Sequence, residues 1–537
     1  MKIIKYKRPL FYLFLFPIIL AFSFESVFKS ITLPRFFNLT ENLLFAILIV
    51  LFSFLITGIK YKKLFLTASV IVFNLCLLFE TLYYYLFDNF LSASAIFVVL
   101  ESNSNEIKEF LSVHFDRYAL ILVTVFFLNI IYISFKKRKY FNAFFEFSVN
   151  RFLIFELLLM LYFVLKLTTL IVYNVPYILI KAPVSYYQEM KKFKNYGKEN
   201  KIGNFTNVKH NTKGKELYVI VLGESTSKRH FNLYNNYYRE TTPLLNSIKD
   251  DLFVFNNVIS AHTYTIGALS KALTLGNYEN PEAKYNGTII QLFNQANFQT
   301  YWISNQRPVG MMDTHITKIG LGAGKSFFLN TKHTSENTNL DDELIKKMRE
   351  ILLIKEDKKI IFLHMLGTHL SYKNRFPANQ NYFKDMPKTK FNTEKAYKII
   401  NDYDNAIRYN DKLLKQIIDI IKAENKTSYV LYFSDHGQEV FDDIDFSGHT
   451  IDEKITKSMY EIPMFLWVSD KYKSKNNLKI NIDNKYMTDD MFHSIADISN
   501  VTSDQIDSTR SIFNEKFKER KRIIKDTIDF DFFFNRH

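Results

Sequence analysis

The sequence predicts an α-helical transmembrane domain with five spans, followed by an α/β domain with a mostly parallel central sheet. Five long apolar segments occupy roughly the first third of the 537 residues. From about residue 215 onward, short β-branched runs alternate with helical segments, which is typical of α/β domains. The overall composition hides this division, because a hydrophobic fraction of 48% and a mean hydropathy of -0.07 also suit a soluble protein.

Each apolar segment is long enough to cross a hydrocarbon core, which needs roughly 17–25 residues of helix. A buried core helix or a signal peptide is the alternative for any single segment, but the first lacks an evident small-residue cleavage site. The repetition at this length favours membrane spans. The segments are Pro9–Phe28, Leu43–Ile59, Leu64–Phe87, Tyr118–Phe135 and Phe152–Tyr173.

Lysine and arginine residues flank alternate ends of these segments. Because basic loops are retained in the cytoplasm, the N-terminus is predicted to be cytoplasmic and everything after Tyr173 to lie outside. The same flanks account for much of the net charge of +15, and no nucleic-acid motif accompanies it. The flanking residues are Lys2, Lys5, Lys7, Arg8, Lys60, Lys62, Lys63, Lys136–Lys139 and Arg151.

Residues 174–214 are predicted to bridge the two domains. Pro176 and Pro183 interrupt this stretch, and apolar residues between them and beyond recur at helical spacing. An amphipathic helix on the membrane surface fits the pattern, and a plain linker is the alternative. The predicted boundaries are 1–173 for the transmembrane domain, 174–214 for the bridge and 215–537 for the α/β domain.

The α/β domain is predicted to contain at least six strands and three helices. Parallel strands end at a common edge of the sheet, where ligands of such sheets bind. The strands are Leu217–Leu222, Phe253–Ile259, Gln299–Ser304, Ile360–Met365, Tyr429–Phe433 and Ile462–Val468, and the helices are Thr288–Ala296, Asp341–Leu353 and Glu394–Ala423.

Acidic, histidine and hydroxyl residues follow four of these strands directly. Taken singly, such residues are usually turn formers, helix caps or structural histidines. Four of them at one predicted sheet edge indicate a functional site. The sequences are GES at 223–225, SAHTYT at 260–265, GTH at 367–369 and SDHG at 434–437.

Glu224, Asp435 and His436 combine carboxylate and imidazole ligands without a thiolate. The only cysteine, Cys76, lies in an apolar segment, so an intrachain disulfide and a cysteine-based zinc site are both excluded. This ligand set suits a catalytic zinc with an open coordination position, and manganese is the alternative.

These motifs resemble the signature of the phosphoethanolamine transferases, which belong to the alkaline phosphatase and sulfatase-like superfamily. The resemblance extends over nearly the whole chain. SDHG alone is shared across the superfamily, whereas its ordered combination with GES and the TxT of HTYT is specific. Further matching segments are Tyr234–Pro243, Trp302–Gln306 and Tyr403–Asn405.

The resemblance implies a ligand set for zinc. Its four members are Glu224, Thr263, Asp435 and His436. Thr263 is also the expected nucleophile, preferred to Thr265 because it matches the first threonine of the family's TxT and precedes a predicted helix.

His369 and His449 match the family's histidines around the phosphoryl group, which bind substrate, take part in catalysis and can also hold a second zinc. The loop between the third and fourth spans resembles the family's lipid-binding loop, so Glu101, Asn103 and Glu106 are candidate contacts for the ammonium or headgroup. A solvated polar loop is the alternative.

Glu80 lies within the third span, where acidic residues are functional candidates by default. The alternative is that its carboxylate reaches the outer interface beside Tyr83–Tyr85.

The resemblance implies transfer of phosphoethanolamine from phosphatidylethanolamine to lipid A or the lipooligosaccharide core, with a covalent Thr263 intermediate and release of diacylglycerol. It places the chain in a bacterial inner membrane with a periplasmic catalytic domain, and it links the activity to polymyxin resistance. HTYT in place of an SCGT-type sequence leans toward the branch whose acceptors include core sugars, so the acceptor stays open.

Two alternatives of function remain. A phosphoglycerol transferase similar to lipoteichoic acid synthase would use phosphatidylglycerol and typically manganese, and a related transferase would modify a periplasmic acceptor other than lipid A. A third possibility, from another class, is a membrane receptor with an inactive enzyme-like domain. The filled metal and nucleophile positions argue against that third possibility.

Overall fold

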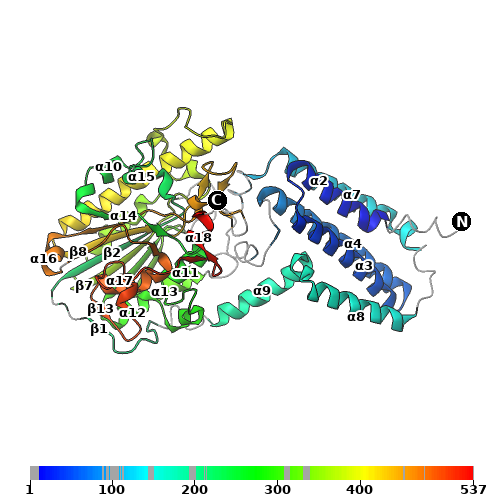
Figure 1. Cartoon of the computed structure of the whole chain (residues 1–537), viewed down its shortest axis with the longest axis horizontal. Helices are drawn as coiled ribbons and strands as arrows, with labels where there is room; N and C mark the ends of the chain where they lie inside the picture. The colour runs from blue at the N-terminus through cyan, green and yellow to red at the C-terminus, as the bar shows by residue number, and fades with distance from the viewer. Residues whose placement is uncertain are drawn as a thin grey trace. The chain divides into compact units, whose positions relative to one another are not determined.

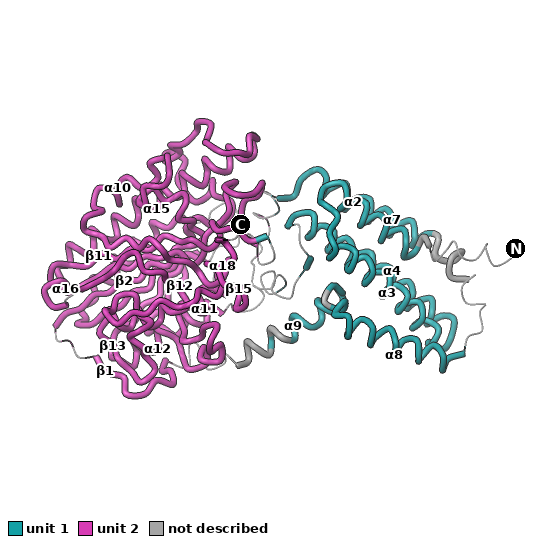
Figure 2. Tube along the Cα trace, in the orientation of Figure 1, with its two compact units in different colours: residues 1–100, 111–187, 452–454 teal, residues 101–110, 188–451, 455–537 magenta. Residues whose placement is uncertain are grey.

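The computed structural model describes residues 11–87, 90–91, 96, 108, 111, 114–142, 150–192, 201–210, 212, 214–306, 315–330, 339–450, 454–476 and 478–535. The chain forms two compact units (Figure 2). We call them the helical unit, which comprises residues 1–100, 111–187 and 452–454, and the α/β unit, which comprises residues 101–110, 188–451 and 455–537.

The helical unit has a helix at each of the five predicted spans. Its helices are α2 (Phe16–Phe28, preceded by a π-helical turn at Phe11–Leu15), α3 (Leu33–Leu55), α4 (Ile59–Phe87), α7 (Arg117–Asn142) and α8 (Arg151–Leu167). By length and apolarity three described helices can cross a membrane, namely Leu33–Leu55, Ile59–Phe87 and the Arg117–Phe135 part of α7. That all five segments cross it stays a prediction.

The helical unit packs around α4. Leu66, Val70, Phe73 and Leu77 of this helix are buried against residues of α2, α3 and α7, among them Phe126. After α8 and a short 3-10 turn, the bridging segment forms α9 (Val175–Lys192), which contains Pro183.

The α/β unit is built on a seven-stranded sheet in the order β3-β11-β8-β2-β7-β5-β6. The strands from β8 to β6 pair in parallel, whereas β11 runs antiparallel to both of its neighbours. The sheet is therefore mixed. Its strands are β2 (Glu216–Gly223), β3 (Leu252–Val254), β5 (Gln299–Ser304), β6 (Lys325–Phe328), β7 (Lys358–His364), β8 (Thr427–Ser434) and β11 (Met464–Val468).

Helices cover both faces of the sheet (Figure 1). Alternate residues of β2 point to opposite faces, as in any strand: Val219 packs with α14 (Asp342–Leu352) and α15 (Glu394–Ala423), while Ile220 packs with the other layer. That layer contains α11 (Thr265–Ala272), α12 (Ile289–Gln295) and α17 (Met491–Ile498). Burial on both faces explains why the parallel strands read as continuous apolar runs.

Short elements complete the unit. The helices are α10 (Pro243–Asn246), α13 (His315–Leu321), α16 (Asp470–Lys475) and α18 (Phe530–Asn535). The paired strands are β1 (Lys209–His210) with β13 (Val501–Thr502), β4 (Val258–Ile259) with β12 (Tyr486–Met487), β9 (Glu439–Val440) with β10 (Ser447–Gly448), and β14 (Ile523–Ile524) with β15 (Ile528–Asp529).

The predicted strand Phe253–Ile259 is wrong as a single element. The chain leaves the main sheet after β3, and β4 pairs with β12 instead. Asn256 lies at the break, where its backbone N–H donates to Ile482 O at 2.8 Å and its side-chain amide donates to Asp483 Oδ1 at 2.6 Å.

Candidate metal centre

The functional residues gather where β2 and β8 end. Gly223 of β2 is in register with Ser434 of β8, so Glu224 and Asp435 leave adjacent strands at the same level of the sheet. β7 lies on the other side of β2 and leads into the segment that carries His369. The predicted convergence of these strand ends is thus observed.

Glu224, Asp435 and His436 form a compact buried group. One candidate ligand atom from each lies within 4.8 Å of the others. His436 Nε2 is 3.5 Å from Glu224 Oε1 and 3.5 Å from Asp435 Oδ2. The three side chains are at most 1% exposed, so they present their polar atoms to one another in a place shielded from water.

The hydrogen bonds around this group leave its inner atoms without partners. His436 Nδ1 lies 2.7 Å from Gly437 O, and Asp435 Oδ1 accepts from the backbone N–H groups of Ser225 and His436 at 2.9 and 2.7 Å. Among the described residues, His436 Nε2 and Asp435 Oδ2 have no hydrogen-bond partner. Buried polar atoms are normally satisfied, and an imidazole held through its other nitrogen is typical of metal sites. The residues therefore fit a metal ion.

The charges of the three side chains also favour a bound cation. Burial and the charge of Glu224 raise the pKa of Asp435 to about 7. Burial alone would lower the pKa of His436, but Asp435 and Glu224 raise it to about 9. The two carboxylates thus stabilise a positive charge between them, and a divalent cation would take the place of the proton on His436.

The two threonines of HTYT have different surroundings. Thr265 begins α11, and its Oγ1 lies 3.2 and 3.1 Å from Oε1 and Oε2 of Glu224. Thr263 Oγ1 instead donates to Thr450 O at 2.6 Å. Thr263 precedes the helix as predicted, but extended Tyr264 separates it from the first helical residue, which is Thr265.

The histidines predicted to surround the phosphoryl group are both close to this group. The ring of His449, which follows β10, lies 4.6 Å from that of His436. Burial lowers the pKa of His369 to about 4, against the opposing charge of Glu224. Burial thus favours the neutral form of the His369 imidazole.

Gln306 was not assigned a role from the sequence, although it ends the matching segment Trp302–Gln306. Its Nε2 donates to Glu224 Oε2 at 2.8 Å and to Met365 O at 3.0 Å. The amide therefore orients the Glu224 carboxylate. A single amide residue carries no pattern that would reveal this contact in the sequence.

The backbone behind Glu224 is closely packed. Gly367 has φ +53°, and a Cβ on it would lie 2.8 Å from Glu224 O and 2.9 Å from Glu224 N. Asp341 fixes the same turn by accepting from the N–H groups of Leu366 and Gly367 at 2.9 and 2.8 Å.

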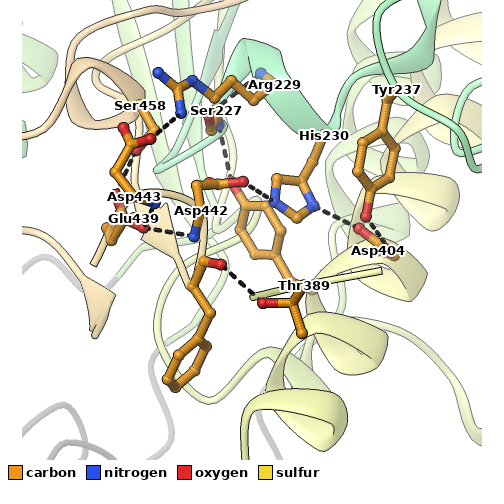
Figure 3. Close-up of polar contacts among 12 residues, drawn as sticks. Ser227, Arg229, His230, Tyr237, Thr389, Asp404, Glu439, Asp442, Asp443 and Ser458 are labelled. Carbon is orange, nitrogen blue, oxygen red and sulfur yellow. Dashed lines mark hydrogen bonds and ion pairs between the residues drawn. The ribbon is translucent and has the colours of Figure 1, made fainter. Parts of the chain in front are cut away.

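Figure 3 shows a second polar network in the α/β unit. His230 lies between Asp404 of α15 and Asp442, and Glu439 Oε1 accepts from the N–H of Asp442 at 2.6 Å. Tyr403 OH donates to Ser225 O at 2.9 Å. The network joins the segment after Glu224 to the segment that leads to His449.

Glu101, Asn103 and Glu106, the predicted headgroup contacts, lie outside the described residues. Their role stays a prediction.

Comparison with known proteins agrees with this geometry. Residues 216–501 match the sulfatase family. Over 470 residues the chain is 31% identical to phosphoethanolamine transferase EptC of Escherichia coli K12, covering 82% of this chain and 81% of the relative. The chain belongs to the phosphoethanolamine transferase family. This transferase is also 30% identical to CptA of Salmonella typhimurium, over 82% of this chain and 81% of that one.

Solved structures resemble the transferase in the same regions. The zinc complex of the C-terminal periplasmic domain of E. coli EptC is 33% identical, covers 62% of this chain and 97% of its own, and has a TM-score of 0.59. The integral membrane protein EptA of Neisseria meningitidis, 19% identical, covers 93% of this chain and 98% of its own with a TM-score of 0.66. The second likeness concerns the fold alone.

Proposed function

We propose that this transferase moves phosphoethanolamine from phosphatidylethanolamine to lipid A or the lipooligosaccharide core, at the periplasmic side of the bacterial inner membrane. The observation that carries the proposal is the contact of the Thr265 hydroxyl with Glu224 inside the buried carboxylate–imidazole group. Membership of the family and the zinc complex of its relative support the same reading.

Thr265, rather than Thr263, is the proposed nucleophile. A threonine hydroxyl is weakly nucleophilic and needs activation, and Thr265 Oγ1 lies against the metal-binding carboxylate whereas Thr263 Oγ1 is occupied by Thr450 O. The Thr265 oxygen attacks the phosphorus of phosphatidylethanolamine, and diacylglycerol leaves with the proton. The acceptor oxygen then attacks the phosphoethanolamine ester and frees Thr265.

Zinc is the proposed cofactor, held by Glu224, Asp435, His436 and Thr265. Bound there, it lowers the pKa of a coordinated hydroxyl and offsets charge on phosphoryl oxygens. A second zinc near His369 and His449 remains part of the proposal.

His369 and His449 are proposed to bind the phosphoryl group and to move protons. His369 is the proposed base toward the acceptor hydroxyl, since burial favours its neutral imidazole, the form that can take up a proton. Glu101, Asn103 and Glu106 are proposed to contact the ammonium of the donor, which would distinguish ethanolamine from glycerol.

Reconstituted full-length protein tests the proposal directly. Proteoliposomes would contain phosphatidylethanolamine or phosphatidylglycerol as donor, with lipooligosaccharide as acceptor, and mass spectrometry would follow the products. We expect phosphoethanolamine on the acceptor and equimolar diacylglycerol only with phosphatidylethanolamine. Transfer of glycerol phosphate from phosphatidylglycerol would favour the alternative transferase, and no transfer from either donor would refute both.

A further inference from the structure

A small polar cavity lies inside the helical unit, between α2, α3 and α4. It has room for about one water-sized group. Apolar side chains such as Ile18 and Leu77 form part of its wall, but half of the wall is polar and buried. The polar residues of the wall are Glu25, Asn38, Asn42, Glu80 and Thr81.

Two asparagines of α3 hold the carboxylate of Glu80. The Asn38 amide donates to Glu80 Oε1, and Asn42 Nδ2 lies 3.4 Å from Glu80 Oε2. Glu80 is 3% exposed. It therefore points into the bundle and does not extend along the helix to the membrane surface.

The cluster has more acidic groups than basic ones. Arg35 Nη2 is 3.4 Å from Glu25 Oε2. Among the described residues, this is the one ion pair made by Glu25, Glu41 or Glu80. Glu41 receives a hydrogen bond of 2.7 Å from Asn174, which is neutral. The cluster thus places the three carboxyl groups of Glu25, Glu41 and Glu80 beside one guanidinium in the described part of the bundle, and acidic groups in such a place are functional candidates.

A second observation points to a missing donor. Among the described residues, Thr81 Oγ1 and Glu41 Oε2 have no hydrogen-bond partner, although both residues are 1% exposed. Thr81 is part of the cavity wall. Glu41 does not line the cavity. Buried oxygens normally accept or donate, so Thr81 Oγ1 offers the cavity an acceptor for a group that carries N–H or O–H bonds.

The cavity lies near one end of the bundle. Glu25 is in the last turn of α2, Asn38 is in the second turn of α3, and Glu80 is two turns before the end of α4. With the predicted cytoplasmic N-terminus, this end faces the outer leaflet. It is the depth at which a lipid headgroup meets the acyl chains.

We propose that this cavity binds the primary ammonium group of a lipid headgroup. An ammonium is about the size of a water molecule and carries one positive charge and three N–H donors. Glu25, Glu80 and the Thr81 hydroxyl offer one acceptor for each donor. That the lipid is phosphatidylethanolamine awaiting transfer rests on the proposed function. A trimethylammonium headgroup has no N–H donor and is too large for the cavity.

Lipid binding to the full chain tests the site. The Thr265→Ala variant in detergent would be titrated with phosphatidylethanolamine and phosphatidylcholine, and native mass spectrometry would count retained lipids. We expect roughly tenfold preference for phosphatidylethanolamine, lost in Glu25→Gln and Glu80→Gln, because charged hydrogen bonds are the strong ones. Glu156→Gln is the matched control, since Glu156 is exposed on α8, and it should keep the preference.

Thr81→Val removes a hydroxyl without changing charge or shape, and it should lower the preference about threefold. If a glutamine variant loses its melting transition, and so is unfolded, the Thr81→Val variant is used to test the proposal in its place. Competition by free phosphoethanolamine would show that the headgroup alone binds, whereas competition only by the lipid would show that the acyl chains are also needed. Both results support the site, and they distinguish binding of the headgroup alone from binding of the whole lipid.

Equal retention of the two lipids by the parent, or an unchanged preference in all three cavity variants, would overturn the proposal. The proposed function is judged separately by transfer in the wild type. A chain that prefers phosphatidylethanolamine but transfers nothing would contradict the function and leave the ammonium site standing.

Discussion

His230 and Asp404 form a buried ion pair, with 2.7 Å between Nδ1 and Oδ1. The other ring nitrogen of His230 lies 3.2 Å from Asp442 Oδ1. Burial alone would lower the pKa of His230, but the charges of Asp442 and Asp404 raise it to about 10. The imidazolium thus connects α15 to the segment that leads to His449.

This pair makes stability depend on pH. The folded pKa of about 10 lies above the unfolded value of about 6.5, so the contribution is complete below pH 6.5 and is lost as the pH rises through about 10. Chemical denaturation should show stability falling over that window, and His230→Gln should remove that fall and cost about 3–5 kcal/mol at pH 7. His493→Gln is the control, because burial lowers the pKa of His493 to about 4. An identical pH profile in His230→Gln would contradict the role of the pair.

The nucleophile assignment separates two hydroxyls. Thr265→Ala should reduce transfer to background with the fold intact, whereas Thr263→Ala should lose a hydrogen bond worth about 0.5–1.5 kcal/mol and stay active. Thr265→Ser should restore measurable transfer. Peptide mapping of protein incubated with phosphatidylethanolamine should place the phosphoethanolamine adduct on Thr265, and an adduct on Thr263 would refute the assignment.

Metal content should follow the three-residue group. His436→Ala and Asp435→Asn remove ligands, so inductively coupled plasma mass spectrometry of purified protein should find less zinc per chain than in wild type. His493→Ala, a change at another buried histidine outside the group, should leave zinc unchanged. Full zinc occupancy in a folded His436→Ala variant would make His436 a structural residue only.

Gln306 should tune the metal without binding it. Gln306→Leu removes the 2.8 Å hydrogen bond to Glu224 and is expected to weaken zinc about 10–100-fold, as loss of a ligand's orienting partner does. Competition with a fluorescent zinc chelator measures the dissociation constant. Gln306→Glu adds a like charge beside Glu224 and should weaken transfer further, whereas unchanged zinc affinity in both variants would count against this role.

The predicted topology has a simple test. A reporter fused after Gly197 follows all five predicted spans, so alkaline phosphatase there should be active in the periplasm. A fluorescent protein fused at the same position should stay dark when exported through the general secretion route. Cytoplasmic fluorescence without phosphatase activity would refute the charge-based orientation.

Patterns that depend on neighbours in the sequence predicted the fold well. β5 and α15 have the predicted bounds, Gln299–Ser304 and Glu394–Ala423, because a buried strand and a long amphipathic helix each repeat one local signal. The break after β3 was missed since it depends on pairing between β4 and β12, more than 200 residues away.

The candidate site was also predictable only where it depends on local sequence patterns. Glu224, Asp435 and His436 follow apolar strands, so their meeting could be predicted from the common edge at which parallel strands end. The preference for Thr263 over Thr265 rested on the family motif, whereas the backbone of Tyr264, with φ -140° and ψ 148°, decides which hydroxyl begins the helix. The contact between Gln306 and Glu224 depends on the path of β5 beside β7.

Gly367 has a consequence for how this family member can vary. Its missing side chain lets the turn after β7 touch the backbone of Glu224, so even a methyl group would displace a proposed metal ligand. In a library of random variants, position 367 should tolerate glycine alone, although no atom of its own takes part in the chemistry. Among active variants of such a library, substitutions at position 367 should be as rare as substitutions at Glu224.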